Sequence, residues 1–516
     1  MLLLRRALPP STAYTTATRR LRVPSRISTL PHPHRLATTS STTSIDPGFV
    51  PRPSDAQRKT IYALSTPPGK AGIAVVRISG PEVLQVWKHI VRRAEPEPWR
   101  MERCKIMHPT GGNMLDDGLA VYFKGPKSFT TEDVLELHIH SGRAIIASVL
   151  GALSHLPFCR PAEPGEFTRR AFLGGRLDLP QVEGLKDLID AETEGQRRLA
   201  LEAAGGAVSA RFEDLRTGII RCLAKIEALI DFSEGEDIED GVYEDARNDA
   251  TTLLATIRSY LGDNRRGEIL RSGVHLTIFG PPNAGKSSLL NFLAQREAAI
   301  VTPVPGTTRD ILELSLDIGG IPVIISDTAG LRPTDDLVEQ IGVERARKAI
   351  QAADIALCVV SCEDTDATRS LPSAVADLVT ERTFVLFNKS DLRPDASDNE
   401  PNNNNGTPTH WWTTSLKTGE GTAEFLTGFA QALKTRFDLD LDQDSPHTPL
   451  ITHARHRVHL ESAAGFIEAF LETTAEDVVI GAEELRYAAQ AVGKVTGRID
   501  VEDILDSLFR DFCIGK

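Results

Sequence analysis

The chain has 516 residues, of which 41% are hydrophobic and 25% are charged, proportions typical of a globular protein. Because single cores rarely grow beyond about 250–300 residues, this length predicts two to four domains. A net charge of -13 excludes a generally basic protein that coats nucleic acid, although a local basic patch is still compatible with RNA binding. No stretch reaches the roughly 18 consecutive apolar residues that a membrane span requires.

Residues 1–50 have the composition of an organelle transit peptide. Arginine, serine and threonine abound there, and the first acidic residue is Asp46. A merely disordered tail is the alternative. We expect a transit peptide, and a mitochondrial one rather than a chloroplast one.

Residues 57–175 are predicted to form a mixed α/β domain. Residues 73–78 are a strand-like run that ends at a Ser-Gly-Pro turn, and residues 134–140 alternate apolar and polar side chains as a half-buried strand does. His138 and His140 share one face of the second strand. No third ligand has an obvious spacing, so a surface pair is favoured over a metal site.

Helical segments at residues 176–268 and 445–516 flank residues 269–436, which alternate strands and helices as a parallel sheet does. The fold class is therefore α/β plus α: an N-terminal α/β domain, a helical domain made from two chain segments, and an α/β domain inserted between them. An independent C-terminal bundle is the alternative. The predicted helices cover residues 181–194, 197–210, 215–230, 243–263, 453–471, 483–496 and 502–512. The acidic break at residues 233–237 is interpreted as a solvated turn rather than a metal site.

The six cysteines are scattered without a CxxC pair, which favours a reducing compartment and argues against structural zinc. Cys358 and Cys362 lie in or just after the apolar run 355–360, so we interpret them as structural thiols. Cys513 opens the final Cys-Ile-Gly-Lys sequence, which fits a prenylation box poorly. The six are Cys104, Cys159, Cys222, Cys358, Cys362 and Cys513.

The middle domain carries a P-loop, residues 280–287, which fits the pattern G-x-x-x-x-G-K-[ST] and follows a strand at residues 276–279. Lys286 would reach the terminal phosphates, and Ser287 would offer its hydroxyl to Mg²⁺. A helix beginning at Ser288 would favour the anion with its positive N-terminus. A lone P-loop could arise by chance or belong to an ATPase. The residues expected at the nucleotide are Asn283, Ala284, Gly285, Lys286, Ser287 and Ser288.

Three further motifs follow in the order of a GTP-binding domain: Asp327-Thr-Ala-Gly330, Asn388-Lys-Ser-Asp391 and Ser415-Leu-Lys417. A first switch is expected at residues 306–310, where Thr307 and Thr308 form a pair and Thr308 is chosen to complete the Mg²⁺ shell. Asp327 ends a predicted strand and can hold Mg²⁺ through water, while Gly330 supplies a backbone N–H near the γ-phosphate.

The last two motifs select the base. Asp391, in Asn388-Lys389-Ser-Asp391, can accept two N–H bonds from guanine's N1 and 2-amino edge, which adenine lacks, so it favours GTP over ATP. Ser415-Leu-Lys417 fits the backbone-and-lysine element that packs around guanine.

The usual water-orienting glutamine is absent after Asp327-Thr-Ala-Gly330, where Leu331 stands. An apolar side chain cannot orient the attacking water. Catalytic help must therefore come from another residue, a partner or a cation. Glu339 is one of the nearby acids.

The chain resembles the TrmE/MnmE family of tRNA-modifying GTPases, in their mitochondrial form, over nearly everything from Lys59 to Lys516. A final Cys-Ile-Gly-Lys is highly specific in combination with a GTPase domain. The sequences that carry the resemblance are Thr66-Pro-Pro-Gly69, Arg77-Ile-Ser-Gly80, Phe129-Thr-Thr-Glu-Asp-Val-Leu-Glu-Leu-His138, Pro164-Gly-Glu-Phe167, Arg170-Ala-Phe172, Leu177-Asp-Leu179, Pro282-Asn-Ala-Gly-Lys-Ser-Ser288, Asp327-Thr-Ala-Gly-Leu-Arg332 and Cys513-Ile-Gly-Lys516.

The resemblance implies that residues 57–175 form a dimerisation domain that binds a one-carbon donor, 5,10-methylenetetrahydrofolate or 5-formyltetrahydrofolate. Carried over by motif, the folate contacts would be Arg77, Glu136 and Arg176, with Lys516 nearby. The family often has lysine where Arg176 stands, which keeps the charge but changes the geometry. The family also assigns Cys513 a role in the modification chemistry.

The resemblance also explains the missing glutamine. Asn283 would coordinate K⁺ together with backbone carbonyls of Thr302 and Val304 and the Thr307 region, and Glu339 would orient the attacking water through a bridging water. Both groups would assemble when two G domains meet in a homodimer. The cation would sit where an arginine finger otherwise stabilises charge.

The implied activity is K⁺-dependent GTP hydrolysis in the mitochondrial matrix, coupled to modification of the wobble uridine of mitochondrial tRNA at carbon 5. An FAD-containing MnmG/GidA-type subunit is the implied partner. The product would be of the 5-carboxymethylaminomethyl or taurinomethyl type. A ribosome-assembly GTPase without RNA chemistry is one rival, but the KH-type RNA domain that such a protein would usually carry is not recognised in the sequence. A scaffold with a non-hydrolysing G domain is another, against which the intact Lys286 and Asp391 count.

Overall fold

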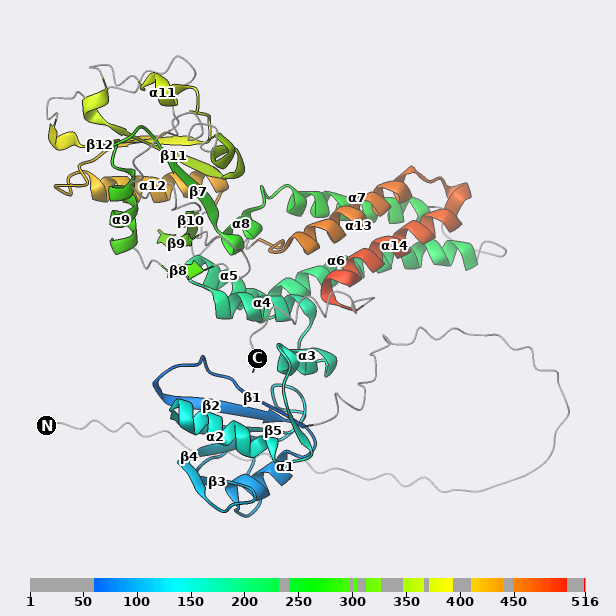
Figure 1. The fold of residues 1–516 in the computed structure, drawn as a ribbon. Coiled ribbons are helices and arrows are strands. Elements are labelled where there is room, and N and C mark those ends of the chain that lie inside the picture. Colours follow the sequence, from blue (N-terminus) through cyan, green and yellow to red (C-terminus); the bar gives the residue numbers. More distant parts are fainter. Residues whose placement is uncertain are drawn as a thin grey trace, which may run out of the picture. The chain divides into compact units, whose positions relative to one another are not determined.

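The computed structural model describes residues 60–231, 241–296, 300–303, 312–325, 347–365, 371–392, 410–439 and 449–498, together with Gly515 (Figure 1). Contacts divide the chain into the units Met1–Phe49 and Val50–Lys516, and every described residue belongs to the second. The predicted transit peptide, residues 1–50, lies outside the described residues. None of the helices within these ranges combines the length and the apolar character that a membrane crossing demands.

The first part of the described chain folds into a six-stranded sheet with the order β3-β4-β5-β2-β1-β6. Neighbouring strands run antiparallel, except for the parallel pair β1 and β6. The strands are β1 Thr60–Leu64, β2 Ala71–Ser79, β3 Met101–Met107, β4 Met114–Phe123, β5 Val134–Ser141 and β6 Cys159–Pro161. The helices here are α1 Val83–Val86, η1 Trp87–Val91, α2 Arg143–Ser154 and α3 Glu166–Leu173.

The two faces of this sheet differ in character. Leu135, Leu137 and Ile139 of β5 belong to a large apolar core that also contains Trp87 of η1 and Leu153 of α2. Because side chains alternate along a strand, the residues between them face the other way, as the sequence pattern of residues 134–140 predicted. A smaller apolar cluster consists of Ile61, Ala63, Ala162 and Phe167, with Phe129 packed against it.

The long helices of the two helical segments share one core. Buried residues of α6 and α7 join buried residues of α13 and α14, which lie alongside them (Figure 1). The two halves of this core are thus separated in the sequence by the whole of the second sheet. The helices are α4 Leu179–Asp190, α5 Glu194–Ala204, α6 Ala207–Asp231, α7 Val242–Leu261, α8 Arg266–Ser272, α13 Ala454–Glu472, η5 Ala475–Asp477 and α14 Val478–Thr496.

The boundaries of four predicted helices were wrong, and one of them, 483–496, begins after the true start of α14 at Val478. The predicted helix 181–194 runs through a break at residues 191–193, where Thr193 caps α5 in a capping box with Gln196. The predicted helix 197–210 runs through a second break at Gly206, which has a φ of 89°. Residues 215–230 lie inside the longer α6, and the predicted helix 502–512 lies outside the described residues.

The second sheet has seven strands in the order β13-β12-β11-β7-β10-β9-β8. The parallel arrangement predicted from the sequence holds from β13 to β10, whereas β9 and β8 are added antiparallel. The strands are β7 Val274–Phe279, β8 Ile300–Pro303, β9 Leu312–Ile318, β10 Ile321–Ile325, β11 Ile355–Ser361, β12 Thr383–Asn388 and β13 Trp411–Thr413. The helical elements are α9 Lys286–Arg296, η3 Cys362–Asp364, α11 Ser373–Ala376, η4 Ser390–Leu392 and α12 Thr422–Phe437.

Both faces of this sheet are buried. Phe384 and Leu386 of β12 pack into one core, and Val385 and Phe387 into another. Strands buried on both faces read as continuous apolar runs, which is why residues 355–360 and 384–387 carry no alternation. Burial raises the pKa of the Cys358 thiol to about 12, as expected of a structural thiol.

Candidate functional site

The P-loop connects β7 to α9 and depends on two glycines. Gly280 has a φ of 149° and Gly285 a φ of 102°, backbone conformations that residues with a side chain rarely adopt. A Cβ on Gly280 would lie 2.0 Å from the Val359 carbonyl oxygen, and one on Gly285 would lie 2.1 Å from Asn388 Nδ2. The loop is therefore fitted closely against β11 and β12. The helix begins at Lys286, two residues before the predicted start at Ser288.

The side chains of the loop divide into buried and exposed ones. Lys286 Nζ donates to the carbonyl oxygens of Gly280 at 2.9 Å and Pro281 at 2.7 Å, and burial lowers its pKa. Ala284 is fully buried. Three polar side chains are exposed, as contact with a ligand requires: Asn283, Ser287 and Ser288. Asn283 stands in the left-handed region with a φ of 59°.

Asn388 joins the P-loop to the two base-selecting motifs. Its Nδ2 donates to the Ala284 carbonyl oxygen at 2.9 Å, and its Oδ1 accepts from the Leu416 N–H at 3.2 Å. Asp391 Oδ1 accepts from the Ser415 hydroxyl at 2.7 Å. These motifs lie far apart in the sequence. The structure brings them together at the carboxyl edge of the sheet, where α/β folds bind their ligands.

The two lysines of these motifs lie apart from that network. Lys389 Nζ lies 3.0 Å from Glu363 Oε2, and Lys417 is exposed. Sequence reasoning missed Glu363. It lies in η3, the short helix that directly follows β11, and the end of a parallel strand beside the P-loop strand was a signal that could have found it.

Several of the predicted site residues lie outside the part of the chain that the structure describes. Thr302 belongs to β8, opposite Glu313. Outside the described residues lie Val304, Thr307, Thr308, Asp327, Gly330, Leu331, Glu339, Cys513 and Lys516. Their predicted roles in holding Mg²⁺ or K⁺, in orienting water, in folate binding and in the modification chemistry stay predictions.

A second constellation lies on the polar face of the first sheet. Arg77 of β2 and Glu136 of β5 are direct cross-strand partners, and Arg77 Nε donates to Glu136 Oε1 at 2.9 Å. Burial alone would raise the pKa of Glu136, but the neighbouring His138 and Arg77 side chains lower it below its ordinary value. His138 Nε2 lies 3.6 Å from Glu136, whereas His140 Nδ1 lies 2.8 Å from Asp116. The two histidines thus have different carboxylate partners.

Two aromatic rings flank this pair. The Arg77 guanidinium carbon lies 5.1 Å from the centroid of the Phe129 ring and 5.8 Å from that of Phe167. Arg176 is exposed, and its Nη1 donates to the Ser128 carbonyl oxygen at 2.7 Å, one residue from Phe129. The structure therefore brings Arg77 and Glu136 into direct contact and ties Arg176 to the loop that carries one of the rings.

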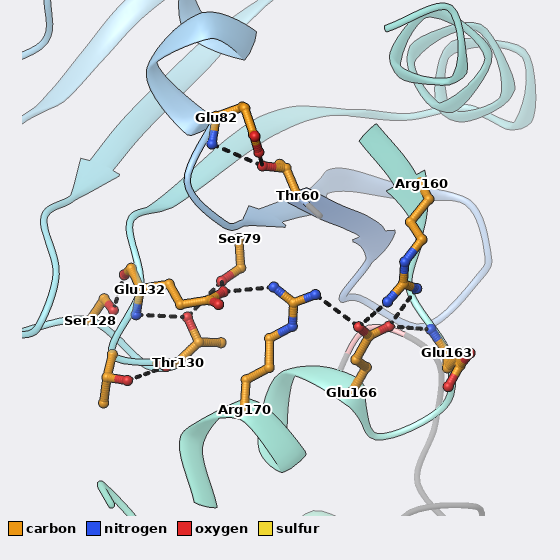
Figure 2. Close-up of polar contacts among 11 residues, drawn as sticks. Thr60, Ser79, Glu82, Ser128, Thr130, Glu132, Arg160, Glu163, Glu166 and Arg170 are labelled. Carbon is orange, nitrogen blue, oxygen red and sulfur yellow. Dashed lines mark hydrogen bonds and ion pairs between the residues drawn. The ribbon is translucent and has the colours of Figure 1, made fainter. Parts of the chain in front are cut away.

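A chain of ion pairs links Glu132, close in sequence to Phe129, with Glu166, the neighbour of Phe167, and sequence reasoning gave it no role. Figure 2 shows Arg170 between Glu132 and Glu166, with Arg160 on the other side of Glu166. Burial alone would raise the pKa of Glu166, but hydrogen bonds from Arg160 and the Glu163 N–H, together with Arg170, lower it below its ordinary value. Most of these residues fall inside the motifs that carry the family resemblance.

Gly515, between the predicted residues Cys513 and Lys516, contacts the end of β1. Its carbonyl oxygen accepts from the Ser65 hydroxyl at 2.9 Å. Gly515 has a φ of 99°, and a Cβ there would lie 2.1 Å from the Leu64 carbonyl oxygen. Leu64 pairs with Val76, the residue before Arg77, so this contact lies close in register to the Arg77–Glu136 pair.

Comparison with known proteins gives matches along both halves of the chain. The family model of the MnmE helical domain matches residues 179–513, and the model of the N-terminus of the GTP-binding protein TrmE matches residues 60–176. The mitochondrial 5-taurinomethyluridine-[tRNA] synthase subunit GTPB3 of Danio rerio is 45% identical over 471 residues, which cover 89% of this chain and 93% of that protein. The tRNA modification GTPase MnmE of Parvibaculum lavamentivorans is 45% identical over 461 residues, which cover 89% of this chain and 100% of that protein.

Proposed function

The chain belongs to the MnmE family of tRNA-modification GTPases, and on that premise we propose that it hydrolyses GTP in the modification of the wobble uridine of mitochondrial tRNA. The observation that carries this proposal is the 45% identity to a mitochondrial tRNA-modifying synthase subunit, which extends along 89% of the chain. The taurinomethyl group in that protein's name favours a taurinomethyl-type product, with the 5-carboxymethylaminomethyl type as the alternative. The mitochondrial relatives, together with the arginine-rich residues 1–50, support a location in the matrix.

The GTPase half of the proposal rests on the carboxyl edge of the second sheet. Asp391, held by Ser415, would read guanine, and Lys286 would leave its carbonyl partners for the terminal phosphates. Ser287 and Thr308 would hold Mg²⁺. The exposed Asn283 would hold K⁺ with the carbonyls of Thr302, Val304 and the Thr307 region. These cations would supply positive charge at the phosphates. Glu339 would orient the attacking water, which the apolar Leu331 cannot do.

The one-carbon half rests on the polar face of the first sheet. Glu136 is ionised at neutral pH, so it can accept hydrogen bonds from the amide and amino edge of a pterin, while Arg77 and Arg176 suit a folate's carboxylates. The donor would be 5,10-methylenetetrahydrofolate or 5-formyltetrahydrofolate. Lys516 and Cys513 would act close by, because the intervening Gly515 contacts Ser65. We propose that a homodimer works with an FAD-containing MnmG/GidA-type subunit.

The cation dependence offers a direct test in the purified full-length protein. We expect GTP hydrolysis in NaCl to be at least about tenfold slower than in KCl, because the arginine finger that such a cation would replace contributes about 10³–10⁵ in rate. Asn283→Ala should remove the difference between the two salts. Asn291→Ala, at an exposed asparagine of α9, should retain it. Equal rates of the wild type in both salts would contradict the role of Asn283.

A further inference from the structure

The two aromatic rings around Arg77 come from different elements. Phe129 belongs to the loop of residues 128–132, and Phe167 lies in the first turn of α3. The space available to a ligand at Arg77 and Glu136 depends on how far apart these two rings are held. Both elements meet at one buried side chain, Arg170, which is only 7% exposed.

On the loop side, Arg170 holds Glu132. Its Nη1 donates to Glu132 Oε2 at 2.8 Å, and the same oxygen accepts from the Ser79 hydroxyl at 2.8 Å. Ser79 Oγ lies 2.6 Å from Thr130 Oγ1, so three positions of β2 and the loop form one network (Figure 2). Thr131 has a φ of 64°, which is unfavourable for a β-branched residue, so contacts within the loop must hold this conformation. Glu132 is thus the anchor that fixes the loop bearing Phe129.

On the helix side, Arg170 holds Glu166. Its Nη2 donates to Glu166 Oε1 at 2.9 Å, one helical turn back along α3. Arg160 Nη1 and the Glu163 N–H both donate to Glu166 Oε2 at 2.9 Å. Glu166 directly precedes Phe167, so this end of the network fixes the start of α3 and the second ring.

We propose that Arg170 is a positioning residue for the one-carbon donor: by holding Glu132 and Glu166 at once, it sets the spacing of Phe129 and Phe167 around Arg77. This inference rests on the proposed folate-binding function. Arginine is required because its planar fork reaches two carboxylates in fixed directions, whereas a lysine ammonium is a single point charge. Arg170 itself touches no ligand in this account.

The test measures the binding of 5-formyltetrahydrofolate to the full-length protein by calorimetry. Arg170→Lys keeps the charge and should weaken binding about tenfold to a hundredfold, the usual effect of losing a group that orients a ligand's direct contacts. GTP hydrolysis should be unchanged, because the second sheet is untouched. Arg103→Lys, the same substitution at an exposed ion pair of β3, should bind as the wild type does. If Arg170→Lys does not fold, Glu132→Gln tests the loop side, since Glu132 is 31% exposed.

A purely structural role is separated from positioning by combining Arg170→Lys with Phe129→Leu. If Arg170 acts through the rings, the double variant should bind 5-formyltetrahydrofolate with nearly the same affinity as whichever single variant binds it more weakly. Losses that simply multiply would overturn the inference. So would wild-type binding by both Arg170→Lys and Glu132→Gln. A wild-type chain that does not bind the folate contradicts the proposed one-carbon function, and the inference with it.

Discussion

At the scale of single residues, Asn388 shows how one motif residue can also join two parts of a predicted site. The sequence predicted Asn388 as a nucleotide contact. In the structure both ends of its amide are used inside the protein, on Ala284 of the P-loop and on Leu416 beside the Ser415 motif. The amide is 3% exposed, so water cannot replace either bond. Asn388 thus keeps the phosphate and base parts of the site in register.

Asn388→Asp should therefore weaken the site even though the shape is conserved. The carboxylate can still accept from Leu416, but it cannot donate to Ala284 and would bring a charge against that carbonyl. We expect a loss of about 1–3 kcal/mol in stability and roughly tenfold weaker GTP binding. Asn291→Asp, at an exposed position of α9, is the matched control. Nucleotide titration and thermal unfolding measure both effects, and wild-type GTP affinity in Asn388→Asp would refute the bridging role.

At the scale of elements, the sequence predicted which segments are helices better than where they begin and end. The capping pair Thr193 and Gln196 interrupts a pattern that reads as nearly continuous helix, because the periodicity of the apolar residues continues across the break. The contacts that join α4 to α13 could not be predicted at all. Glu183 bonds to Arg455 and His456, more than 270 residues further on, and local patterns carry no information at that separation.

We expect this cluster to make the helical domain sensitive to acid. His456 Nε2 lies 2.8 Å from Glu183, and Arg455 Nη1 also donates to the carbonyl oxygens of Lys494 and Val495 at the end of α14. Burial lowers the pKa of His456 despite the adjacent carboxylate. Burial alone would raise the pKa of Glu183, but His456 and Arg455 lower it below its ordinary value.

The lowered pKa values of His456 and Glu183 affect stability one after the other as the pH falls. Below the ordinary histidine pKa of about 6.5 the unfolded chain takes up a proton that buried His456 resists, so stability is lost at up to about 1.4 kcal/mol per pH unit. The contribution of Glu183 is present above about pH 4.3 and is lost as pH falls towards its folded pKa.

His456→Gln should reduce the loss of stability that occurs as the pH falls below about 6.5. Hydrogen exchange of α13 compared at pH 5, 6 and 7 should show the wild type losing protection faster than the variant. Exposed His89→Gln should behave as the wild type does. The same pH dependence in His456→Gln as in the wild type would rule out His456 as the titrating group.

At the scale of the whole molecule, the sequence motifs predicted which residues would bind nucleotide, whereas the order of the strands determines how these residues lie relative to one another. The P-loop and the guanine motifs were recognisable as sequence patterns, and they meet because each lies at the end of a strand of the same parallel sheet. Arg77 and Glu136 entered only through the family resemblance, since an arginine and a glutamate on strands so far apart carry no local signal. The network around Arg170 was missed for the same reason, although most of its members stand in the motifs themselves.

The central claim is that GTP hydrolysis by this chain serves tRNA modification. Mass spectrometry of wobble nucleosides in mitochondrial tRNA from cells lacking the protein tests it most directly. We expect unmodified uridine to accumulate, wild-type protein to restore the modification, and Lys286→Ala to fail although exposed Lys88→Ala succeeds. Normally modified wobble uridines in cells without the protein would contradict the account.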